Sequence, residues 1–334
     1  MRIGIIGLGR QGWRLAKAIK EAGDVLVVGA TEKKCKNSQI FADNFKCEII
    51  NNWQELVKRD DIEAIVICTP PSLHAKMSIA ALKNNKNVFC EKPLALSSDE
   101  AQEIIKEAQK RNLKLKCGFN LRHHPAVVKA KERVDKGLIG KPFLIRCCYG
   151  IGGRKGYEKD WRAKKEISGG GQLMDQGVHI IDLSRWFLGE FNQVFGTLST
   201  NFWKISPLED NAFFILGTDK NQTSFCHASW TQWKNLFSFE IYGELGYIKI
   251  EGLGGSYGTE KFIFGKRDFD SPFSEEIIEF RGEDQSWLCE WQEFTSAIKE
   301  DRQPLGNGYD GLKSLDIVEA IYKSAKTKKM IKLN

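Results

Sequence analysis

The feature that most constrains the fold is a glycine run near the N-terminus, Gly7-Leu8-Gly9-Arg10-Gln11-Gly12, which directly follows the apolar segment 3–6. A strand that turns through glycines into a helix opens many doubly wound α/β domains, and the helix N-terminus there binds phosphate. The three glycines have separate expected roles: a tight turn, close approach of backbone to a pyrophosphate, and close helix-to-strand packing. By itself the run predicts only a phosphate-binding turn.

The first 120 residues alternate short β-branched runs with longer helical patterns. We predict strands at about 2–6, 25–30, 48–50, 64–69, 87–91 and 114–119, and helices at about 10–22, 38–45, 53–58, 73–84 and 98–111. Ser97 and Glu100 have the spacing of a capping box at the start of the last helix. Strands joined by crossover helices predict a parallel, doubly wound Rossmann sheet over residues 1–120, with ligands beyond the carboxyl ends of its strands.

The pattern changes near residue 121. From about residue 143 the chain offers many alternating segments with few helices between them, including 143–149, 213–216, 237–242 and 247–251. Helices are predicted at about 172–188, 285–300 and 310–327. We therefore expect residues 121–334 to form a second domain around a largely antiparallel sheet, packed on the first without a linker.

Composition excludes several classes of protein. The 334 residues are 42% apolar, which suits about two domains, and the net charge of +7 is spread along the chain as solvated surface rather than a nucleic-acid-binding block. No stretch approaches a signal peptide or a membrane span, so we expect a cytoplasmic protein. Nine scattered cysteines without a C-x-x-C pair predict reduced thiols and no metal site.

A carboxylate follows the second predicted strand. Glu32 stands twenty residues after Gly12, where it would take the hydroxyls of the adenosine ribose, and this placement favours NAD. The neighbouring Lys33 and Lys34, with Lys36 beyond, could instead meet the 2′-phosphate of NADP. A solvated charge run is the alternative for these lysines.

Two later strand ends carry residues capable of chemistry. Thr69-Pro70-Pro71-Ser72-Leu73-His74 follows the fourth strand, and Glu91-Lys92-Pro93 follows the fifth. The carboxyl end of a strand beside the crevice is where a nicotinamide ring would lie, and Pro93 restricts the backbone of Lys92. An exposed turn with a solvated lysine is the competing interpretation.

The second domain supplies a glycine run followed by a helical segment, residues 168–182. On a helix, Asp175, His179 and Asp182 share one face, whereas the other faces are apolar. A polar stripe on an apolar helix is costly to bury, and an imidazole beside a carboxylate suits acid–base chemistry. A structural Asp–His hydrogen bond is the alternative; two metal ligands are a third interpretation, without a His- or Cys-rich segment to support it.

Taken together, these residues resemble the glucose-fructose oxidoreductase and inositol dehydrogenase family (Gfo/Idh/MocA). The resemblance covers essentially the whole chain and rests on the order and spacing of its motifs: the first glycine run, Thr69-Pro70 with His74, Glu91-Lys92-Pro93, the glycines at 169–171 before Asp175 and His179, and Trp186-Phe187-Leu188-Gly189.

The resemblance implies an N-terminal Rossmann domain and a C-terminal α/β domain with a large open sheet, paired in homodimers or homotetramers. It implies that Lys92, Asp175 and His179 are the catalytic set. Many members have Asn where Pro71 stands, so here the nicotinamide ribose would be held by backbone or by His74. The cofactor residues expected are Gly7, Gly9, Arg10, Gln11, Gly12, Glu32, Lys33, Thr69, Pro70, His74, Glu91 and Lys92.

The expected reaction is hydride transfer between a nicotinamide and a secondary alcohol or ketone of a sugar, a nucleotide-linked or acidic sugar derivative, or a cyclitol. His179 would move the hydroxyl proton, Lys92 would stabilise alkoxide charge, and Asp175 would orient the imidazole and bind substrate. Substrate contacts are also expected from Arg122, Trp161 and Arg162. Two alternatives are a catalytically silent, cofactor-sensing regulator of the same fold and a reductase of imines or enones.

Overall fold

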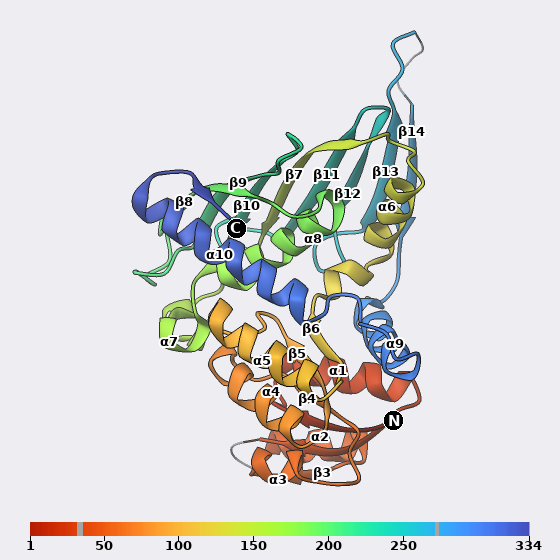
Figure 1. Cartoon of the computed structure of the whole chain (residues 1–334), viewed down its shortest axis with the longest axis vertical. Helices are drawn as coiled ribbons and strands as arrows, with labels where there is room; N and C mark the ends of the chain where they lie inside the picture. The colour runs from red at the N-terminus through yellow and green to blue at the C-terminus, as the bar shows by residue number, and fades with distance from the viewer. Residues whose placement is uncertain (32–35, 271–273, 334) are drawn as a thin grey trace. The chain divides into compact units, whose positions relative to one another are not determined.

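The computed structural model describes residues 1–31, 36–270 and 274–333, and its contacts divide the chain into two compact units (Figure 1). The first unit comprises Met1–Asn120 and Trp287–Lys313, and the second comprises Leu121–Ser286 and Ser314–Asn334. The stretch 287–313, which the sequence analysis assigned to the second domain, thus groups with the first unit.

The first unit contains the predicted Rossmann sheet. Within the described residues its six strands are all parallel and lie in the order β3-β2-β1-β4-β5-β6. The strands are β1 (Arg2–Ile6), β2 (Val25–Ala30), β3 (Glu48–Ile50), β4 (Ala64–Ile67), β5 (Asn87–Glu91) and β6 (Leu115–Gly118). The helices are α1 (Arg10–Glu21), α2 (Lys36–Phe45), α3 (Trp53–Val57), α4 (His74–Lys83), α5 (Ser98–Lys110) and α9 (Ser286–Lys299).

The start of α5 shows how local sequence sets these boundaries. The Ser97 hydroxyl accepts a hydrogen bond from the backbone N–H of Glu100 at 3.3 Å, as the capping-box spacing predicts. The Glu100 carboxylate, however, accepts from the N–H of Leu96 at 3.0 Å instead of that of Ser97. The hydrogen bond that the Glu100 side chain makes in the capping box is therefore displaced by one residue, to the N–H of Leu96. The predicted start of the helix is confirmed.

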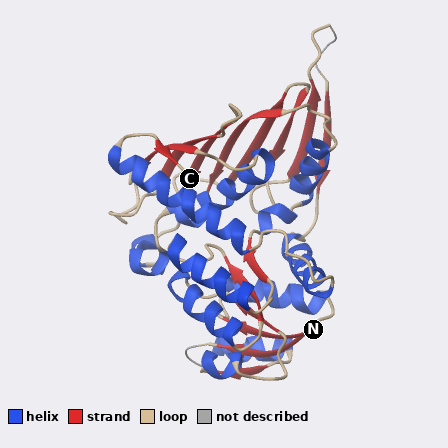
Figure 2. Ribbon diagram, in the orientation of Figure 1, coloured by secondary structure: helices blue, strands red, loops and turns tan. Residues whose placement is uncertain are grey.

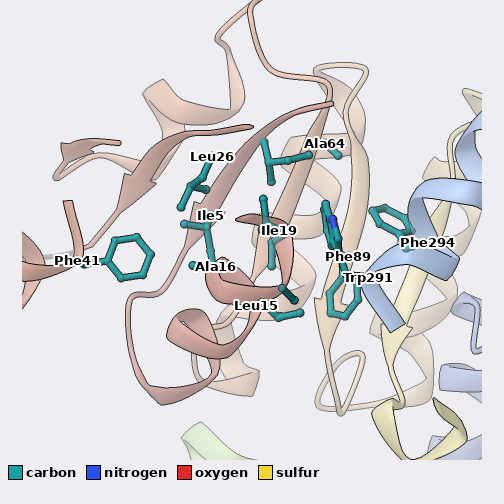
Figure 3. Packing of buried hydrophobic residues seen from close by; sticks show 13 residues of the cluster. Ile5, Leu15, Ala16, Ile19, Leu26, Phe41, Ala64, Phe89, Trp291 and Phe294 are labelled. Atoms are coloured by element: carbon teal, nitrogen blue, oxygen red, sulfur yellow. The ribbon is translucent and has the colours of Figure 1, made fainter. Parts of the chain in front are cut away.

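Helix α9 packs on the first sheet through aromatic rings. The Phe89 ring on β5 lies 6.2 Å from the Trp291 ring and 5.8 Å from the Phe294 ring, centroid to centroid (Figure 3). The Trp291 indole N–H also donates to Asp24 Oδ2 at 2.8 Å. Because these rings are fully buried with Ile5, they complete the core of the Rossmann unit.

The second unit is built on one large sheet (Figure 2). Counted over the described residues, the sheet has nine strands in the order β14-β13-β12-β11-β7-β10-β9-β8-β15. The pair β7–β10 is parallel and the other pairs are antiparallel, so the predicted mostly antiparallel sheet is confirmed. The strands are β7 (Pro142–Gly150), β8 (Gln193–Ser199), β9 (Asn211–Gly217), β10 (Thr223–Ser229), β11 (Leu236–Gly243), β12 (Gly246–Glu251), β13 (Glu260–Lys266), β14 (Glu275–Phe280) and β15 (Ile331–Lys332).

Helices α6 (Pro125–Asp135) and α8 (Val178–Leu188) pack on this sheet, against β13 and β7 respectively. The predicted helix at 172–188 is confirmed in extent, but its first turn, Leu173–Gly177, is π-helical. Helix α6 was not predicted; Pro125 at its first helical position is the signal that identifies it. The remaining helices are α7 (Lys165–Ser168) and α10 (Gly308–Thr327).

Two features of the described part of the chain bear on the classes that composition excluded. Each helix there is too short or too polar to span a bilayer. No group of three or more His, Cys, Asp or Glu side chains in these residues is arranged to hold a metal ion.

Candidate active site

The three glycines of the first glycine run, Gly7, Gly9 and Gly12, have different surroundings. Gly7 has a φ of 97°, and a Cβ there would lie 2.7 Å from the backbone carbonyl of Cys68, beyond the end of β4. A Cβ on Gly12 would lie 2.1 Å from the carbonyl oxygen of Gly7. A Cβ on Gly9 would meet nothing within 4 Å. Packing therefore requires glycine at the first and third positions, whereas the second leaves open space.

The open space at Gly9 lies at the N-terminus of α1. Gly9 is the N-cap residue, no side chain caps the helix there, and its first turn holds no acidic residue. Backbone N–H groups and the positive end of the helix dipole are thus available to a phosphate. Arg10 is exposed, and Gln11 accepts a hydrogen bond from the Arg14 guanidinium at 2.9 Å. These residues fit a dinucleotide pyrophosphate.

The predicted ribose-binding positions Glu32 and Lys33, with the neighbouring Lys34, lie outside the described residues. Their roles stay predictions from the sequence.

His74 contacts both of the turns that follow strands β4 and β5 in the first unit. Its ring Nδ1 lies 2.7 Å from the carbonyl oxygen of Pro93, and Nε2 lies 2.8 Å from that of Thr69. Both partners are acceptors, so a neutral ring can donate to only one of them, while burial lowers the pKa of His74 despite both contacts. The structure thus shows His74 as a clamp between the turns after β4 and β5; its predicted contact with the ribose stays untested.

The Glu91-Lys92-Pro93 turn follows β5 as predicted. Glu91 is 5% exposed, Lys92 is half-buried, and the peptide bond between Lys92 and Pro93 is cis. Burial raises the pKa of Glu91 to about 7, although the charges of Lys92 and Arg14 and hydrogen bonds from the Lys92 backbone N–H and the Gln11 side chain oppose the shift. A carboxyl group that changes charge near neutral pH therefore lies directly beside Lys92.

The second unit holds Asp175 and His179 on consecutive turns of the π-helix and α8. Asp175 is partly exposed, and its Oδ2 lies 3.6 Å from Arg162 Nε. His179 is 5% exposed, with its ring 6.2 Å from the Tyr149 ring in an edge-on arrangement. The pair combines an accessible carboxylate with an enclosed imidazole, which suits substrate binding and proton transfer.

Glu209 fixes the start of this segment. Its main-chain oxygen accepts from the Gln172 N–H at 3.0 Å, and its carboxylate accepts from the Leu173 N–H at 3.0 Å and the Tyr322 hydroxyl at 2.8 Å. A Cβ on Gly171 would lie 2.1 Å from that main-chain oxygen. The second glycine run is therefore required for close packing ahead of the helix that carries Asp175.

Asp182, the third member of the predicted polar stripe, has a different partner. Its two carboxylate oxygens accept from Arg122 Nε at 2.8 Å and Nη2 at 2.6 Å, and both side chains are buried. The Arg122 guanidinium also lies 5.3 Å from the centre of the Trp186 ring. The structure thus places Arg122, predicted as a substrate contact, in a buried ion pair.

Trp161 and Arg162 lie together on the segment before the glycine run. The Arg162 guanidinium lies 4.2 Å from the centre of the Trp161 ring, and the Arg162 N–H donates to Asp160 Oδ1 at 3.1 Å. Since the same guanidinium approaches Asp175, three of the predicted residues, Trp161, Arg162 and Asp175, form one connected group.

The sequence points to Tyr149 as a residue that should approach the crevice, but it gives no sign of the contacts that Gln176 and Tyr257 make beside it. The Gln176 amide donates to the Tyr257 hydroxyl at 3.0 Å, and the Tyr257 ring lies 5.3 Å from the Tyr149 ring. Tyr149 and Tyr257 come from distant parts of the chain, so no local spacing announces the contact. The nearest signal is the position of Tyr149 at the end of a predicted strand.

A Rossmann sheet with an open phosphate turn, joined in one chain to a unit that carries an Asp–His pair, defines a dinucleotide-dependent oxidoreductase. Family models agree with this class. Residues 1–119 match the model described as "Oxidoreductase family, NAD-binding Rossmann fold", and residues 127–249 match the "GFO/IDH/MocA C-terminal domain". The chain belongs to the Gfo/Idh/MocA family, its first unit is an NAD-binding domain, and its cofactor is NAD.

Individual relatives and structures support the same assignment. Levoglucosan dehydrogenase of Pseudarthrobacter phenanthrenivorans is 34% identical over 65% of this chain, a match that spans 60% of that protein, less than two thirds of its length. Myo-inositol 2-dehydrogenase of Thermotoga maritima is 27% identical over 100% of this chain and 98% of its own. A solved levoglucosan dehydrogenase in complex with NADH shares the fold, with a TM-score of 0.92, 24% identity and coverage of 100% and 99%.

Proposed function

We propose that this protein is an NAD-dependent dehydrogenase that interconverts a secondary alcohol and a ketone on a sugar, a sugar derivative or a cyclitol. The observation that carries the proposal is the pairing, on consecutive helical turns, of an accessible Asp175 held by Arg162 with an enclosed His179. The names of the relatives, dehydrogenases of levoglucosan and inositols, support polyhydroxylated substrates.

The residues divide the reaction between them. The glycine turn of residues 7–12 would hold NAD, which would supply the acceptor for the hydride of the carbinol carbon. His179 takes the proton of the reacting hydroxyl group, and the Lys92 ammonium stabilises the negative charge that develops on its oxygen. Asp175 binds a neighbouring hydroxyl group of the substrate and orients the imidazole ring of His179. In the reverse direction His179 returns the proton to the alkoxide.

The substrate class follows from the group around Asp175. The Trp161 ring offers an apolar face for a sugar ring, and Arg162 offers a cation for a phosphate or carboxylate substituent. We propose a polyhydroxylated ring, with an acidic or nucleotide-linked derivative as the variant that Arg162 favours.

Turnover tests the catalytic assignment. Lys92→Met and His179→Ala are each expected to lower kcat by about two orders of magnitude or more, with NADH affinity nearly unchanged, because each removes a group that acts on the reacting oxygen. The assay follows NADH absorbance across a panel of sugars and cyclitols, and Lys83→Met, at an exposed position, is the control. Wild-type turnover in both variants would overturn the proposal.

The glycine turn allows a separate test of cofactor binding. Gly9→Ala adds a methyl group to open space, so we expect the fold to be kept and NADH binding to weaken by about tenfold or more. Gly12→Ala forces a contact with the Gly7 carbonyl and is expected to lower the melting temperature as well. Equal NADH affinity of wild type and Gly9→Ala, measured by fluorescence titration, would remove Gly9 from the cofactor site.

We also propose that the protein is a cytoplasmic homo-oligomer, a homodimer or a homotetramer. Large apolar side chains are exposed on β8, β9 and β10, and a monomer rarely leaves such a set uncovered: Phe195, Phe213, Ile215 and Phe225. The cysteines in the described residues are free thiols, which suits a reducing compartment. Ile215→Glu should shift the mass in sedimentation towards the monomer; an unchanged mass would exclude this face.

A further inference from the structure

Two large aromatic side chains of the second unit are exposed in neighbouring loops. Phe202 is 59% exposed and Trp233 is 63% exposed, and their rings contact each other edge to face at 4.7 Å, centroid to centroid. Phe202 follows β8 and Trp233 follows β10. Large rings that lie against one another in solvent, instead of in the core, are typical of a surface that binds a ligand.

The loops that present these rings are held firmly. The carboxylate of the fully buried Asp210 accepts from the backbone N–H groups of residues 201–203 at 2.9, 2.8 and 3.0 Å. Trp233 has a φ of 55°, a left-handed conformation that is strained for a side chain of this size. A Cβ on Gly152 would lie 3.2 Å from the Trp233 Cα, so glycine makes room for this backbone. The exposure of both rings is therefore built into the fold.

A basic segment begins beside this aromatic pair, two residues after Gly152. Residues 154–165 contain six Lys or Arg residues and two acidic residues. Lys204 and Lys234, which are both exposed, add ammonium groups in the two loops that carry the rings. An aromatic pair flanked by cations matches a nucleobase joined to phosphates, because the base offers a planar face and the phosphates carry negative charge.

Ion pairs lead from this segment to the carboxylate proposed to bind the sugar. Arg154 forms an ion pair with Asp160, yet the Arg154 side chain is 61% exposed, so part of its guanidinium group is accessible to a ligand. Asp160 Oδ1 lies 3.4 Å from Arg162 Nη1, and Arg162 Nε lies 3.6 Å from Asp175 Oδ2. Two guanidinium groups therefore belong to the series of contacts that ends at Asp175.

Consecutive residues before β9 fix both ends of this surface. Glu209 accepts from the N–H of Leu173, at the start of the helical turn that carries Asp175. The next residue, Asp210, accepts from the N–H of Phe202. Both acidic side chains are buried. The aromatic pair and Asp175 are thus anchored to one point of the second unit, as two subsites for a single extended ligand require.

We propose that the Phe202–Trp233 pair and the basic segment 154–165 bind the nucleoside diphosphate of a nucleotide-linked sugar. The base lies on the rings, and Arg154 and Arg162 bind the phosphates. The inference rests on the proposed function in placing the sugar at Asp175 and His179, and it selects one of the substrate classes that the function leaves open. A free sugar or a cyclitol carries neither the planar base nor the phosphates that this surface suits.

Binding of uridine diphosphate to the full chain saturated with NADH tests the subsite, because NADH fills the dinucleotide site of the first unit. Stacking accepts any base, so uridine diphosphate serves as the probe and inorganic pyrophosphate as its base-free counterpart. Calorimetry should show uridine diphosphate binding at least about tenfold more tightly than pyrophosphate. Trp233→Ala and Phe202→Ala should each remove most of that difference and leave pyrophosphate binding unchanged. Trp233→Phe should keep most of it.

Two further variants separate charge from stacking. Arg154→Gln should weaken uridine diphosphate and pyrophosphate alike, by about fivefold, and should reduce the salt dependence of both. Phe269→Ala, at a ring that is 84% exposed elsewhere on the second unit, and Lys326→Gln, at an exposed lysine of α10, are the matched controls and should bind as the wild type does.

Three results would overturn the inference. One is the absence of uridine diphosphate binding, and another is wild-type affinity in both Trp233→Ala and Phe202→Ala. The third is a lower sedimentation mass of Trp233→Ala, which would assign the rings to an interface between copies of the chain. Oxidation of free sugars or cyclitols that Lys92→Met abolishes would then leave the proposed function intact, whereas wild-type turnover in Lys92→Met would overturn the proposed function itself.

Discussion

Each unit of this protein buries an ion pair, and the two pairs differ in how completely they satisfy their charges. In the second unit Arg122 donates two hydrogen bonds, at 2.8 and 2.6 Å, one to each oxygen of Asp182. In the first unit Lys116 lies 3.3 Å from one oxygen of Glu290 and donates at 2.6 Å to a backbone carbonyl, with a second carboxyl group nearby.

The difference follows from the two cations. A guanidinium is a planar fork that matches both oxygens of a carboxylate, so the Arg122–Asp182 pair is complete without a proton. An ammonium is a compact charge, and here it donates its hydrogen bond to the carbonyl oxygen of Leu305 and approaches Glu290 only as an ion pair. The bidentate geometry of the Arg122–Asp182 pair, the closed pair, therefore satisfies both carboxylate oxygens, whereas the geometry of the Lys116–Glu290 pair, the open pair, leaves the Glu290 carboxyl group without a well-formed hydrogen bond among the described residues.

The largest expected effect comes from breaking the closed pair. Arg122→Ala leaves the Asp182 charge buried without its guanidinium, so we expect the free energy of unfolding to fall by about 3–5 kcal/mol. Arg133→Ala removes a more exposed pair with Glu276 and should cost about 1 kcal/mol or less. Chemical denaturation followed by tryptophan fluorescence measures both. Equal losses would mean that burial and bidentate geometry do not distinguish these pairs.

The open pair should make stability depend on pH. The pKa values of Glu91 and Glu290 are raised on folding, so the folded state binds more protons than the unfolded state between about pH 5 and pH 8. The contribution of these groups to stability is thus present at low pH and lost as pH rises, by at most about 1.4 kcal/mol per pH unit for each group.

Denaturation curves across this window check the sign. Glu290→Gln should make the decline shallower, because one of the two raised groups is gone, and Glu300→Gln should leave the slope unchanged. An equally steep decline in wild type and Glu290→Gln would contradict the assignment of the pH dependence to the open pair.

The smallest effect is expected when both charges of the open pair are removed together. Lys116→Met/Glu290→Gln leaves no unpaired buried charge at these positions, so we expect stability at pH 6 to stay within about 1–2 kcal/mol of the wild type. The single variant Lys116→Met should lose more, and its loss should grow with pH as the two carboxyl groups ionise. A double variant less stable than the wild type by clearly more than about 2 kcal/mol would show that the pair is net stabilising.

The first unit could be predicted almost completely because its signals are local. Strand and helix positions up to residue 118 agree with the periodicity of the sequence, and the glycine turn follows from spacing alone. The pairing of Lys116 with Glu290 could not be predicted, because α9 returns to the first sheet only after eight of the nine described strands of the second sheet. A lysine inside an apolar strand, with Leu115 and Cys117 on either side, is the only local hint that a buried partner exists.

The second unit shows a different limit. Spacing placed Asp175, His179 and Asp182 on one helical face, but it cannot say that Asp182 pairs with Arg122 while Asp175 faces Arg162. The choice depends on which distant side chain reaches each carboxylate, and that is set by packing. For the same reason His74 could be marked as capable of binding but not as a clamp between Thr69 and Pro93.

The return of residues 287–313 to the first unit affects how the protein is made. On a ribosome residues 1–120 emerge before α9, so Phe89 and Lys116 have no partners from α9 until residues 286–299 have been synthesised. A fragment that ends near residue 120 would expose the aromatic face of its sheet and a lysine without its carboxylate. The nucleotide-binding unit is therefore largely synthesised before the second unit, yet it completes its core only after most of the second unit has been made.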